Sequence, residues 1–505
     1  MKILFIASEV EGLVKTGGLA DVAYALPKEL QRLGHDVRIV MPAYRSLNDI
    51  WMQWPKRQFS TKISYFNTET VDARYGEHED LPIIAIDHPA SFDRNGIYDD
   101  GHDAFYDNPY RFTVMTKAAL DWCKLENWQP DIVHANDWQS SLAGFFLQEH
   151  YRHDPFFSAT RSVLSIHNGA YQMHCDPKWL AQVGIDQRFY NPSDFEDNGH
   201  LNMLKGALGF ADGVTTVSPG YAAELTTPIG GHGIDFKFRN LHRPIVGILN
   251  GCDYDQWNPE TDPWLLAQFA TPDDGGKARC KLGLQREMGL SIDAKVPLLA
   301  TICRLVDQKG ITYLIPVFKE LMANHNCQVA MLGSGDPLLV AQLEQIQAEF
   351  PDRFRFVNGY DAGLSHRIEA GSDAFLMPSI FEPCGLNQIY SLRYGTVPLV
   401  REVGGLQDSV CRLSKSERNL KSATGFMFSE LSEAALLEEV LRMLNVYQHK
   451  QTQWKALQRN GMAKRFSWKK SACQYQEFYR LLLDTPRAEH PLAIWARPPG
   501  RSIDT

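Results

Sequence analysis

The feature that most constrains the fold is an alternation of short apolar runs with segments of helical periodicity. The chain opens with an apolar run over 2–7 and continues through a loop that contains Gly17 and Gly18. Apolar residues then recur at helical spacing over 22–33, and a second apolar run follows over 37–41. A strand, a glycine loop, a helix and a strand in this order predict the start of a doubly wound α/β sheet.

The second half of the chain repeats this architecture without repeating the sequence. Its apolar runs lie at 298–302, 328–332, 354–357, 374–377 and 397–400. A chain of 505 residues is long enough for two such domains. Proline, aspartate and glycine mark a break between the halves. The predicted organisation is an N-terminal domain over 1–250, a linker over 251–276, a C-terminal domain over 277–468, and a C-terminal helix with a flexible tail over 469–505.

Composition excludes several classes of protein. The net charge of −9 and the pI near 6.0 argue against a nucleic-acid partner. No run approaches the roughly 18 apolar residues of a membrane span, and the N-terminus does not resemble a secretory signal. The nine cysteines are scattered and never form Cys-x-x-Cys. We therefore expect a cytoplasmic protein with reduced thiols, no membrane partner and no structural zinc.

Polar residues gather where apolar runs of the first half end. The run at 131–134 leads to Asp137, and the run at 162–166 leads to His167 and Asn168. Ligands bind at the carboxyl ends of the strands in open α/β sheets. A single His or Asp is more often a cap or a satisfied core residue, but recurrence at one edge favours a site.

A Glu-Pro-Cys-Gly-Leu segment follows the run at 374–377. Pro383 suits the first position of a helix, which leaves the amides of Gly385, Leu386 and Asn387 without helical partners. Such amides bind anions, so Glu382 beside them should face a neutral, hydroxyl-rich group. A phosphate next to a polyol is a sugar nucleotide. The alternative is an ordinary capped helix with a surface glutamate.

Two cations follow the first strand of the second half. Arg304 and Lys309 lie five residues apart at a strand-to-helix turn, where they can flank a diphosphate without Mg²⁺. Two exposed basic residues are the plainer interpretation. Asp253-x-Asp255 resembles the metal-binding pair of some glycosyltransferases, but no third ligand is near it in sequence, so we expect no metal and no other cofactor.

Seven motifs together resemble those of bacterial glycogen synthases and plant starch synthases over nearly the whole chain. They begin at Lys15 (KTGGLAD), His134 (HANDW), Ser165 (SIHN), Thr215 (TTVSP), Asn250 (NGCD), Arg304 (RLVDQKG) and Glu382 (EPCGL). The resemblance implies the GT-B fold, in which two doubly wound, Rossmann-like domains face each other across a deep interdomain cleft. It also implies retaining transfer of glucose from ADP-glucose to the non-reducing end of glycogen or another α-1,4-glucan.

The resemblance carries roles onto matching positions. Catalytic roles fall on His167, Arg304, Lys309, Glu382 and Asp137, with Arg304 and Lys309 on the diphosphate and His167 near the reacting carbon. Substrate-binding roles fall on Lys15, Gly17, Gly18, Asp21, Asn168, Asn250, Tyr360, Cys384, Gly385, Leu386 and Asn387, with Tyr360 stacked on the adenine.

The sequence departs from the family pattern at a few positions. Asn387 and Val403 stand where threonine is more usual, and Gly169 replaces a leucine. Eight residues after Glu382 comes Tyr390 rather than the glutamate of many other retaining transferases. Because no second carboxylate is near Glu382 in sequence, we expect same-face attack, in which the departing phosphate takes the acceptor proton, rather than a covalent intermediate.

Other enzymes and a non-catalytic binding protein are the alternatives to a glucan synthase. A UDP-glucose-dependent transferase similar to sucrose synthase would share the fold, and an epimerase would leave the acceptor-side motifs unexplained. A catalytically silent glucan-binding protein should have lost Lys15, Arg304, Lys309 or Glu382, yet all four are present. The dinucleotide motif of dehydrogenases is absent from both halves. The chain is also short for a glycogen phosphorylase.

Overall fold

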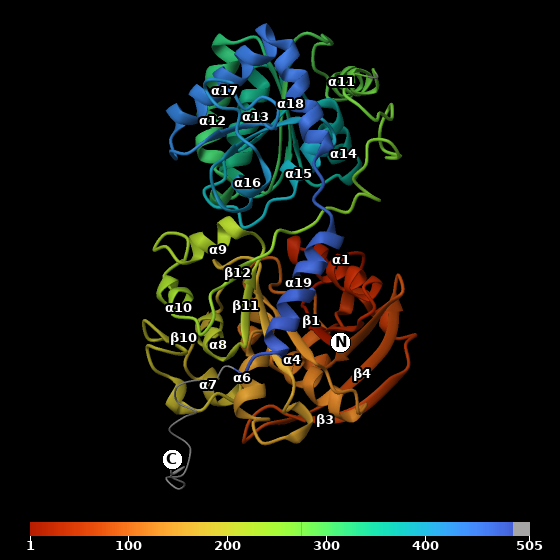
Figure 1. Cartoon of the computed structure of the whole chain (residues 1–505), viewed down its shortest axis with the longest axis vertical. Coiled ribbons are helices and arrows are strands. Elements are labelled where there is room, and N and C mark those ends of the chain that lie inside the picture. The colour runs from red at the N-terminus through yellow and green to blue at the C-terminus, as the bar shows by residue number, and fades with distance from the viewer. Residues whose placement is uncertain (274, 488–505) are drawn as a thin grey trace. The chain divides into compact units, whose positions relative to one another are not determined.

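The computed structural model describes residues 1–273 and 275–487, which form two compact units (Figure 1). Unit 1 contains residues 1–217 and 222–248 together with the described part of 468–505. Unit 2 contains residues 218–221 and 249–467. The segment expected to be a linker, 251–276, therefore falls within unit 2. Most of the expected tail, 488–505, lies outside the described residues.

Unit 1 is built on a nine-stranded sheet with the order β12-β11-β7-β6-β1-β2-β5-β4-β3, parallel from β12 to β5 and antiparallel beyond. The strands are β1 (Lys2–Ile6), β2 (Asp36–Pro42), β3 (Lys56–Lys62), β4 (Thr68–His78), β5 (Leu81–Asp87), β6 (Ile132–Asn136), β7 (Arg161–Ile166), β11 (Gly213–Thr216) and β12 (Val246–Gly247). A small antiparallel sheet adds β8 (His174–Cys175), β10 (His200–Asn202) and β9 (Glu196–Asp197).

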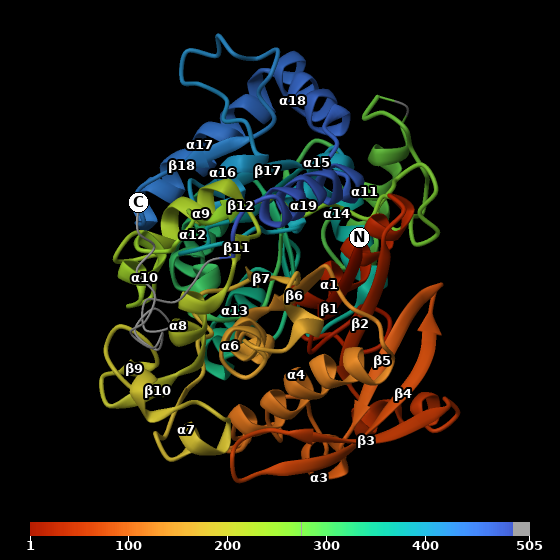
Figure 2. The same cartoon turned by 60° about the horizontal axis from the view of Figure 1, so that its bottom comes forward.

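The helices of unit 1 cover this sheet. They are α1 (Gly18–Arg32), α2 (Asn48–Trp51), α3 (Pro89–Phe92), α4 (Asn108–Leu125), α5 (Asp137–Ser140), α6 (Leu142–Glu149), α7 (Trp179–Gln182), α8 (Met203–Ala207), α10 (Asp235–Arg239) and α19 (Trp468–Leu483), while α9 (Pro219–Leu225) crosses the boundary with unit 2. Figure 2 shows α4 lying along β3, β4 and β5, which it contacts. Residues 50–100 show a less regular apolar pattern in the sequence than the flanking segments. They nevertheless form the antiparallel strands that extend this sheet.

The last described helix returns to unit 1. Helix α19 packs beside α1, with Tyr475 and Tyr479 buried (Figure 1). The Tyr479 hydroxyl is 2.6 Å from Nδ1 of His134 on β6, and Nε2 of that imidazole is 2.6 Å from the Ser165 hydroxyl on β7. The C-terminal helix is thus bonded to the central strands of the first unit.

Unit 2 holds a six-stranded parallel sheet with the order β15-β14-β13-β16-β17-β18. Its strands are β13 (Leu298–Ile302), β14 (Gln328–Gly333), β15 (Phe354–Asn358), β16 (Ala374–Met377), β17 (Val397–Arg401) and β18 (Phe426–Phe428). Its helices are α11 (Gly276–Glu287), α12 (Ile311–Asn324), α13 (Pro337–Glu349), α14 (Ala362–Gly371), α15 (Asn387–Arg393), α16 (Gly404–Ser409), α17 (Glu433–His449) and α18 (Gln451–Ala463).

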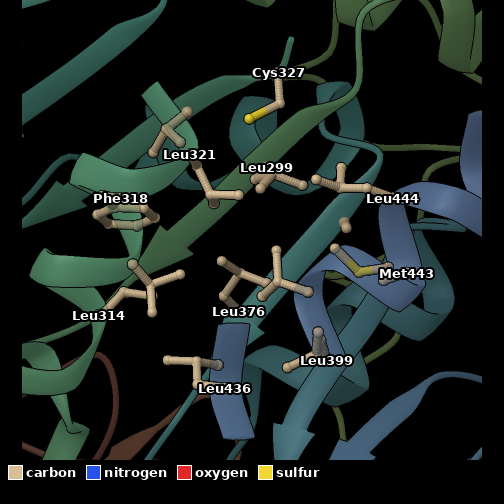
Figure 3. Close-up of a cluster of buried hydrophobic side chains, with 14 of the residues drawn as sticks. Leu299, Leu314, Phe318, Leu321, Cys327, Leu376, Leu399, Leu436, Met443 and Leu444 are labelled. Carbon is tan, nitrogen blue, oxygen red and sulfur yellow. The ribbon is translucent and has the colours of Figure 1, made fainter. Parts of the chain in front are cut away.

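Both faces of the unit 2 sheet are covered, which explains its continuous apolar strands. Leu299 and Leu376 face one layer, where they pack with Phe318 of α12 and Met443 of α17 (Figure 3). The strand neighbour Leu298 belongs to a second buried cluster on the other face. Side chains alternate along a strand, so this sheet needs apolar residues at successive positions. No helix of the described residues has the length and apolar character to cross a membrane.

Candidate active site

In unit 1, a buried carboxylate shapes the loop that leads into α1. Glu9, which is 3% exposed, accepts hydrogen bonds from the Thr16 amide (2.5 Å), the Thr16 hydroxyl (2.7 Å) and the Gly17 amide (3.3 Å). The Tyr98 hydroxyl donates to the same carboxylate over 2.5 Å. A Cβ at Gly17 or Gly18 would meet nothing within 4 Å, so the space over the loop is open.

Lys15 stands at the start of this loop between two acids. Its ammonium lies 2.7 Å from the Glu11 carboxylate and 2.8 Å from that of Asp21. Burial disfavours the charge, but pairing with Asp21 and Glu11 outweighs burial and raises the pKa of Lys15. The loop therefore presents a fixed cation beside an open glycine surface.

The end of β6 contacts the end of β7 through Asp137. This residue has a φ of +51° and accepts hydrogen bonds from the His167 amide (2.7 Å) and the Asn168 amide (3.4 Å). Burial raises the pKa of Asp137 to about 7. The expected proximity of Asp137 and His167 is present, but the carboxylate bonds to the backbone and not to the imidazole.

The His167 imidazole is held by a neighbouring amide side chain. Its Nε2 donates to the Asn136 Oδ1 over 2.9 Å. Burial lowers the pKa of His167 to about 4, so the ring is neutral near pH 7. A neutral imidazole with Nε2 protonated has a lone pair on Nδ1, which can accept a hydrogen bond from a sugar hydroxyl.

In unit 2, Lys309 and Glu382 form an ion pair. They follow β13 and β16, which are neighbours in the sheet, and their side chains meet at 2.6 Å. The Ser379 hydroxyl donates to the same carboxylate over 2.9 Å. The sequence predicted that Glu382 would face a neutral hydroxyl-rich group; in this structure it faces Lys309 and Ser379.

A cavity of about 130 Å³ opens beside this pair. It is lined by Thr301, Ile302, Cys303, Lys309, Leu376, Met377, Pro378, Ser379, Glu382, Gly385, Leu386 and Asn387. Residues after two strands and in the loop before α15 thus line one hollow that is mostly apolar and carries the Lys309, Ser379 and Glu382 side chains, at the carboxyl edge of a parallel sheet where ligands bind.

The prediction that Pro383 begins a helix is wrong. Helix α15 begins at Asn387, because Gly385 has a φ of +72°, which the helical path does not allow. The Pro383 carbonyl accepts a hydrogen bond from the Ser218 hydroxyl over 2.6 Å. The Asn387 side chain donates to the Ile302 carbonyl over 2.7 Å, so this unusual asparagine ties α15 to the end of β13.

Cys384 and Asn250 lie together in unit 2. Burial raises the pKa of the Cys384 thiol to about 12, and the Asn250 backbone lies against it. The Asn250 Oδ1 is buried and has no hydrogen-bond partner among the described residues. An unpartnered buried acceptor is costly, which suits a side chain that bonds to a ligand.

Two further predicted residues are exposed. Arg304 and Tyr360 follow β13 and β15, and Tyr360 is 85% exposed. Within the part of the chain that the structure describes, neither side chain makes a hydrogen bond or an ion pair.

The Asp253 carboxylate, which resembled one half of a metal-binding pair in the sequence, accepts a hydrogen bond from the Asp255 amide over 2.9 Å. This carboxylate therefore closes a turn.

The sequence assigned no individual role to four residues that organise these sites. Asn136 orients His167, Ser379 bonds to Glu382, and Glu9 with Tyr98 holds the loop before α1. Asn136 and Ser379 follow apolar runs, a signal that was available. For Glu9 the sequence indicates only an acidic residue after a strand. Its hydrogen-bond partner Tyr98 lies 89 residues further along the chain, so no local pattern links the two.

Comparison with known proteins agrees with this geometry. A family model described as the starch synthase catalytic domain matches residues 2–240, and one described as glycosyl transferases group 1 matches residues 288–460. Glycogen synthase from Photobacterium profundum is 41% identical over 486 residues, which cover 95% of this chain and 94% of the relative. Glycogen synthase from Aeromonas hydrophila is 42% identical and covers 95% and 98%.

Solved structures agree on the fold. The catalytic domain of starch synthase IV from Arabidopsis thaliana, bound to ADP and acarbose, superposes with a TM-score of 0.85 at 34% identity over 96% of this chain and 99% of that one. Sucrose-phosphate synthase from Thermosynechococcus elongatus, at 18% identity and a TM-score of 0.57, shares the GT-B fold alone. By these matches over nearly its full length, the chain belongs to the glycogen synthase family of glycosyltransferases.

Proposed function

We propose that this protein transfers glucose from ADP-glucose to the non-reducing end of an α-1,4-glucan, with retention of configuration and release of ADP. The reaction runs in the cytoplasm and needs no metal ion. The observation that carries the proposal is the Lys309–Glu382 pair in the lining of a cavity at the carboxyl ends of β13 and β16. It combines a cation for a phosphate with acceptors for sugar hydroxyls.

The unit 2 residues serve the leaving group. Lys309 and Arg304 bind the diphosphate of the donor, whose negative charge grows as the glycosidic bond breaks. When the phosphate takes Lys309, Glu382 is released to accept hydrogen bonds from the glucose hydroxyls, with Ser379 still donating to it. Tyr360, exposed at the end of β15, stacks on the adenine.

The unit 1 residues serve the sugar and the acceptor. Lys15, beside Gly17 and Gly18, provides a cation for the donor phosphates, and Asp21 keeps that cation in place. His167 is neutral and accepts a hydrogen bond from glucose near the reacting carbon. Asp137 is a positioning residue, because its contacts go to the backbone amides of His167 and Asn168.

Retention proceeds here by same-face attack. Tyr390 occupies the position where other retaining transferases have a second glutamate, and its ring stacks on Trp257 at 3.8 Å. A buried, stacked phenol offers no carboxylate for a glycosyl-enzyme. The leaving phosphate therefore takes the proton of the acceptor hydroxyl as that oxygen bonds to the anomeric carbon.

The test is nucleoside diphosphate release with glycogen as acceptor, comparing ADP-glucose with UDP-glucose at equal concentration and with EDTA present. We expect rapid ADP release and glucan growth, slow UDP release, and new linkages that β-amylase digests. Preference for UDP-glucose would overturn the assigned donor. Loss of turnover in EDTA would overturn the metal-free mechanism. No turnover with either donor would favour a silent glucan-binding protein.

A further inference from the structure

A loop of unit 2 exposes two large apolar side chains. Between β12 and α11, Trp264 is 52% exposed and Leu266 is 67% exposed. Neither belongs to the candidate active site described above. Large apolar residues that are exposed together often mark a binding surface.

The loop is fixed on both sides of the exposed residues. Before them, the buried Asp262 accepts hydrogen bonds from the Trp264 amide (2.9 Å), the His366 imidazole (2.7 Å) and the Tyr394 hydroxyl (2.5 Å). After them, the Cys280 thiol donates to the Ala267 carbonyl over 3.1 Å. A rigid loop that holds Trp264 outward loses little entropy when a ligand binds.

Two glycines leave the space against which the exposed side chains pack. A Cβ at Gly363 would come within 2.6 Å of the Trp264 ring, and a Cβ at Gly283 would come within 2.7 Å of Leu266. The Trp264 ring thus packs against α14 at Gly363, and Leu266 packs against α11 at Gly283. Between the loop, α11 and Arg367 is a hollow of about 380 Å³, within the size range of small-molecule sites.

Hydrogen-bonding groups line the same hollow. Arg367 binds the Glu287 carboxylate through Nε (2.8 Å) and Nη2 (2.7 Å). Its Nη1 takes no part in that pair, and a Cβ added at Gly363 would come within 2.8 Å of it, next to the Trp264 ring. The hollow therefore combines an aromatic face, a fixed donor and a carboxylate that offers acceptors.

We propose that this hollow, the Trp264 platform, binds a linear stretch of α-1,4-glucan through residues that the candidate active site does not use. The apolar face of a glucose ring stacks on Trp264, and its hydroxyls bond to Arg367 and Glu287. The proposal rests on the proposed function only in the choice of polymer, since an enzyme that extends a glucan has many chains of it at hand.

Charge favours a neutral sugar over an anion. The Arg367 charge is compensated by Glu287 in a two-bond contact, so the donor beside Trp264 offers a hydrogen bond with little net charge. An acid placed there would meet the Glu287 carboxylate. An aromatic face with paired polar groups suits a polyol that is apolar on its ring faces and polar at its rim.

The test is retardation of the full chain in native gels containing glycogen, without any donor. For Trp264→Ala we expect the dissociation constant to rise about tenfold, as for the loss of one strong stacking contact. Trp264→Phe should recover part of the affinity. Arg367→Gln should weaken binding severalfold. Leu338→Ala, on α13 of the same unit and 72% exposed in the parent, is the matched control and should bind like the parent.

Kinetics provide a second reading. In Trp264→Ala the KM for glycogen should rise, while kcat and the KM for maltotriose, a short acceptor used as the comparison, should stay unchanged. Unaltered retardation of Trp264→Ala would overturn the inference, as would a fall in molar mass by light scattering, which would assign the platform to a second copy of this chain. Displacement of glycogen by inorganic phosphate at this platform would overturn it in favour of an anion.

Failure of this inference and failure of the proposed function are distinguishable. Retardation needs no donor, so a parent protein without turnover can still lose glycogen binding on Trp264→Ala, which supports the platform alone. If the parent protein has full turnover and Trp264→Ala binds glycogen as the parent does, the proposed function stands and the platform is ruled out.

Discussion

Carboxylates do different work in the two units. In unit 1, Glu9 and Asp137 accept hydrogen bonds from backbone amides, and so fix the course of the chain near Lys15 and His167. In unit 2, Glu382 pairs with the Lys309 side chain. The first kind of contact builds a rigid site before substrate arrives. The second kind holds the Lys309 ammonium in an ion pair that a substrate phosphate can replace.

This difference separates stability from activity. Removing an acid that accepts buried amides leaves those amides unpaired, which lowers the free energy of unfolding as well as activity. Removing a side chain whose role is to contact the substrate should lower activity and change the free energy of unfolding little. The following substitutions test that division.

Lys309→Ala should have the largest effect on activity. It removes the cation assigned to the donor diphosphate and leaves the Glu382 carboxylate, which is 5% exposed, without its ion-pair partner but still bonded to Ser379. Loss of one preorganised charge contact at the leaving group should lower kcat/KM for ADP-glucose by about 10³-fold. Steady-state ADP release measures this change.

Lys309→Arg and Glu382→Gln sharpen the first prediction. Arginine keeps the charge and should recover part of the rate. Glutamine can still accept the Ser379 hydrogen bond, so Glu382→Gln should fold like the parent and lose rate through the sugar contact. A Lys309→Ala enzyme within tenfold of the parent would contradict the role given to this pair.

Asp137→Asn should lower kcat by about tenfold and change how stability depends on pH. The amide oxygen of asparagine can still accept from His167 and Asn168, and asparagine tolerates the φ of +51°. The rate falls because the ionised Asp137, which is populated at and above its pKa of about 7, holds these amides more firmly than a neutral amide oxygen does. Activity at pH 7 measures the first effect, and thermal unfolding across pH the second.

The sign of the pH effect follows from the raised pKa of Asp137. With a pKa of about 7 in the fold and 3.8 ordinarily, the folded protein keeps a proton that the unfolded chain loses. Its contribution to stability is full below pH 4 and is lost as pH rises through 7. The Tm of Asp137→Asn minus that of the parent should therefore increase from pH 5 to pH 8; a constant difference would contradict the buried acid.

Glu9→Gln should have a moderate effect on both properties. Glutamine offers one acceptor and a donor where the parent offers two charged oxygens, so the contacts to Thr16, Gly17 and Tyr98 are partly lost. We expect a Tm lower by on the order of 5 °C and a severalfold higher KM for ADP-glucose. Tyr98→Phe, which removes one donor to Glu9, is the matched milder variant. An unchanged Tm would argue against the amide-binding role.

The sequence predicted the strands of unit 2 well because they are buried on both faces. Strand β16 has the predicted bounds, Ala374–Met377, and β13 agrees at Leu298–Ile302. Strand β3 gave no such signal, because six of its seven residues are not buried. Apolar runs reveal strands only where two layers cover the sheet.

The candidate site was predictable where its residues follow apolar runs, and less so elsewhere. Asp137 and His167 come directly after β6 and β7, and Lys309 and Glu382 lie in the segments that follow β13 and β16, as expected. The left-handed turn at Gly385 was not foreseen, since glycine permits this conformation without requiring it. The return of α19 to β6 through Tyr479 joins residues 345 apart, and no local pattern encodes such a contact.

Tyr360→Ala should have the smallest effect and is the cleanest test of the division between the units. The ring is 85% exposed, so its removal should leave the Tm unchanged. If it stacks on the adenine, the KM for ADP-glucose should rise about three- to tenfold, kcat should stay near the parent value, and Tyr360→Phe should retain most of the affinity. An unchanged KM would remove Tyr360 from the donor site, whereas a fall in Tm would mean that the exposed ring has a packing role. Either result would weaken the contrast between Glu9 and Asp137, which hold the backbone of unit 1, and the side chains of unit 2 that are assigned to the substrate.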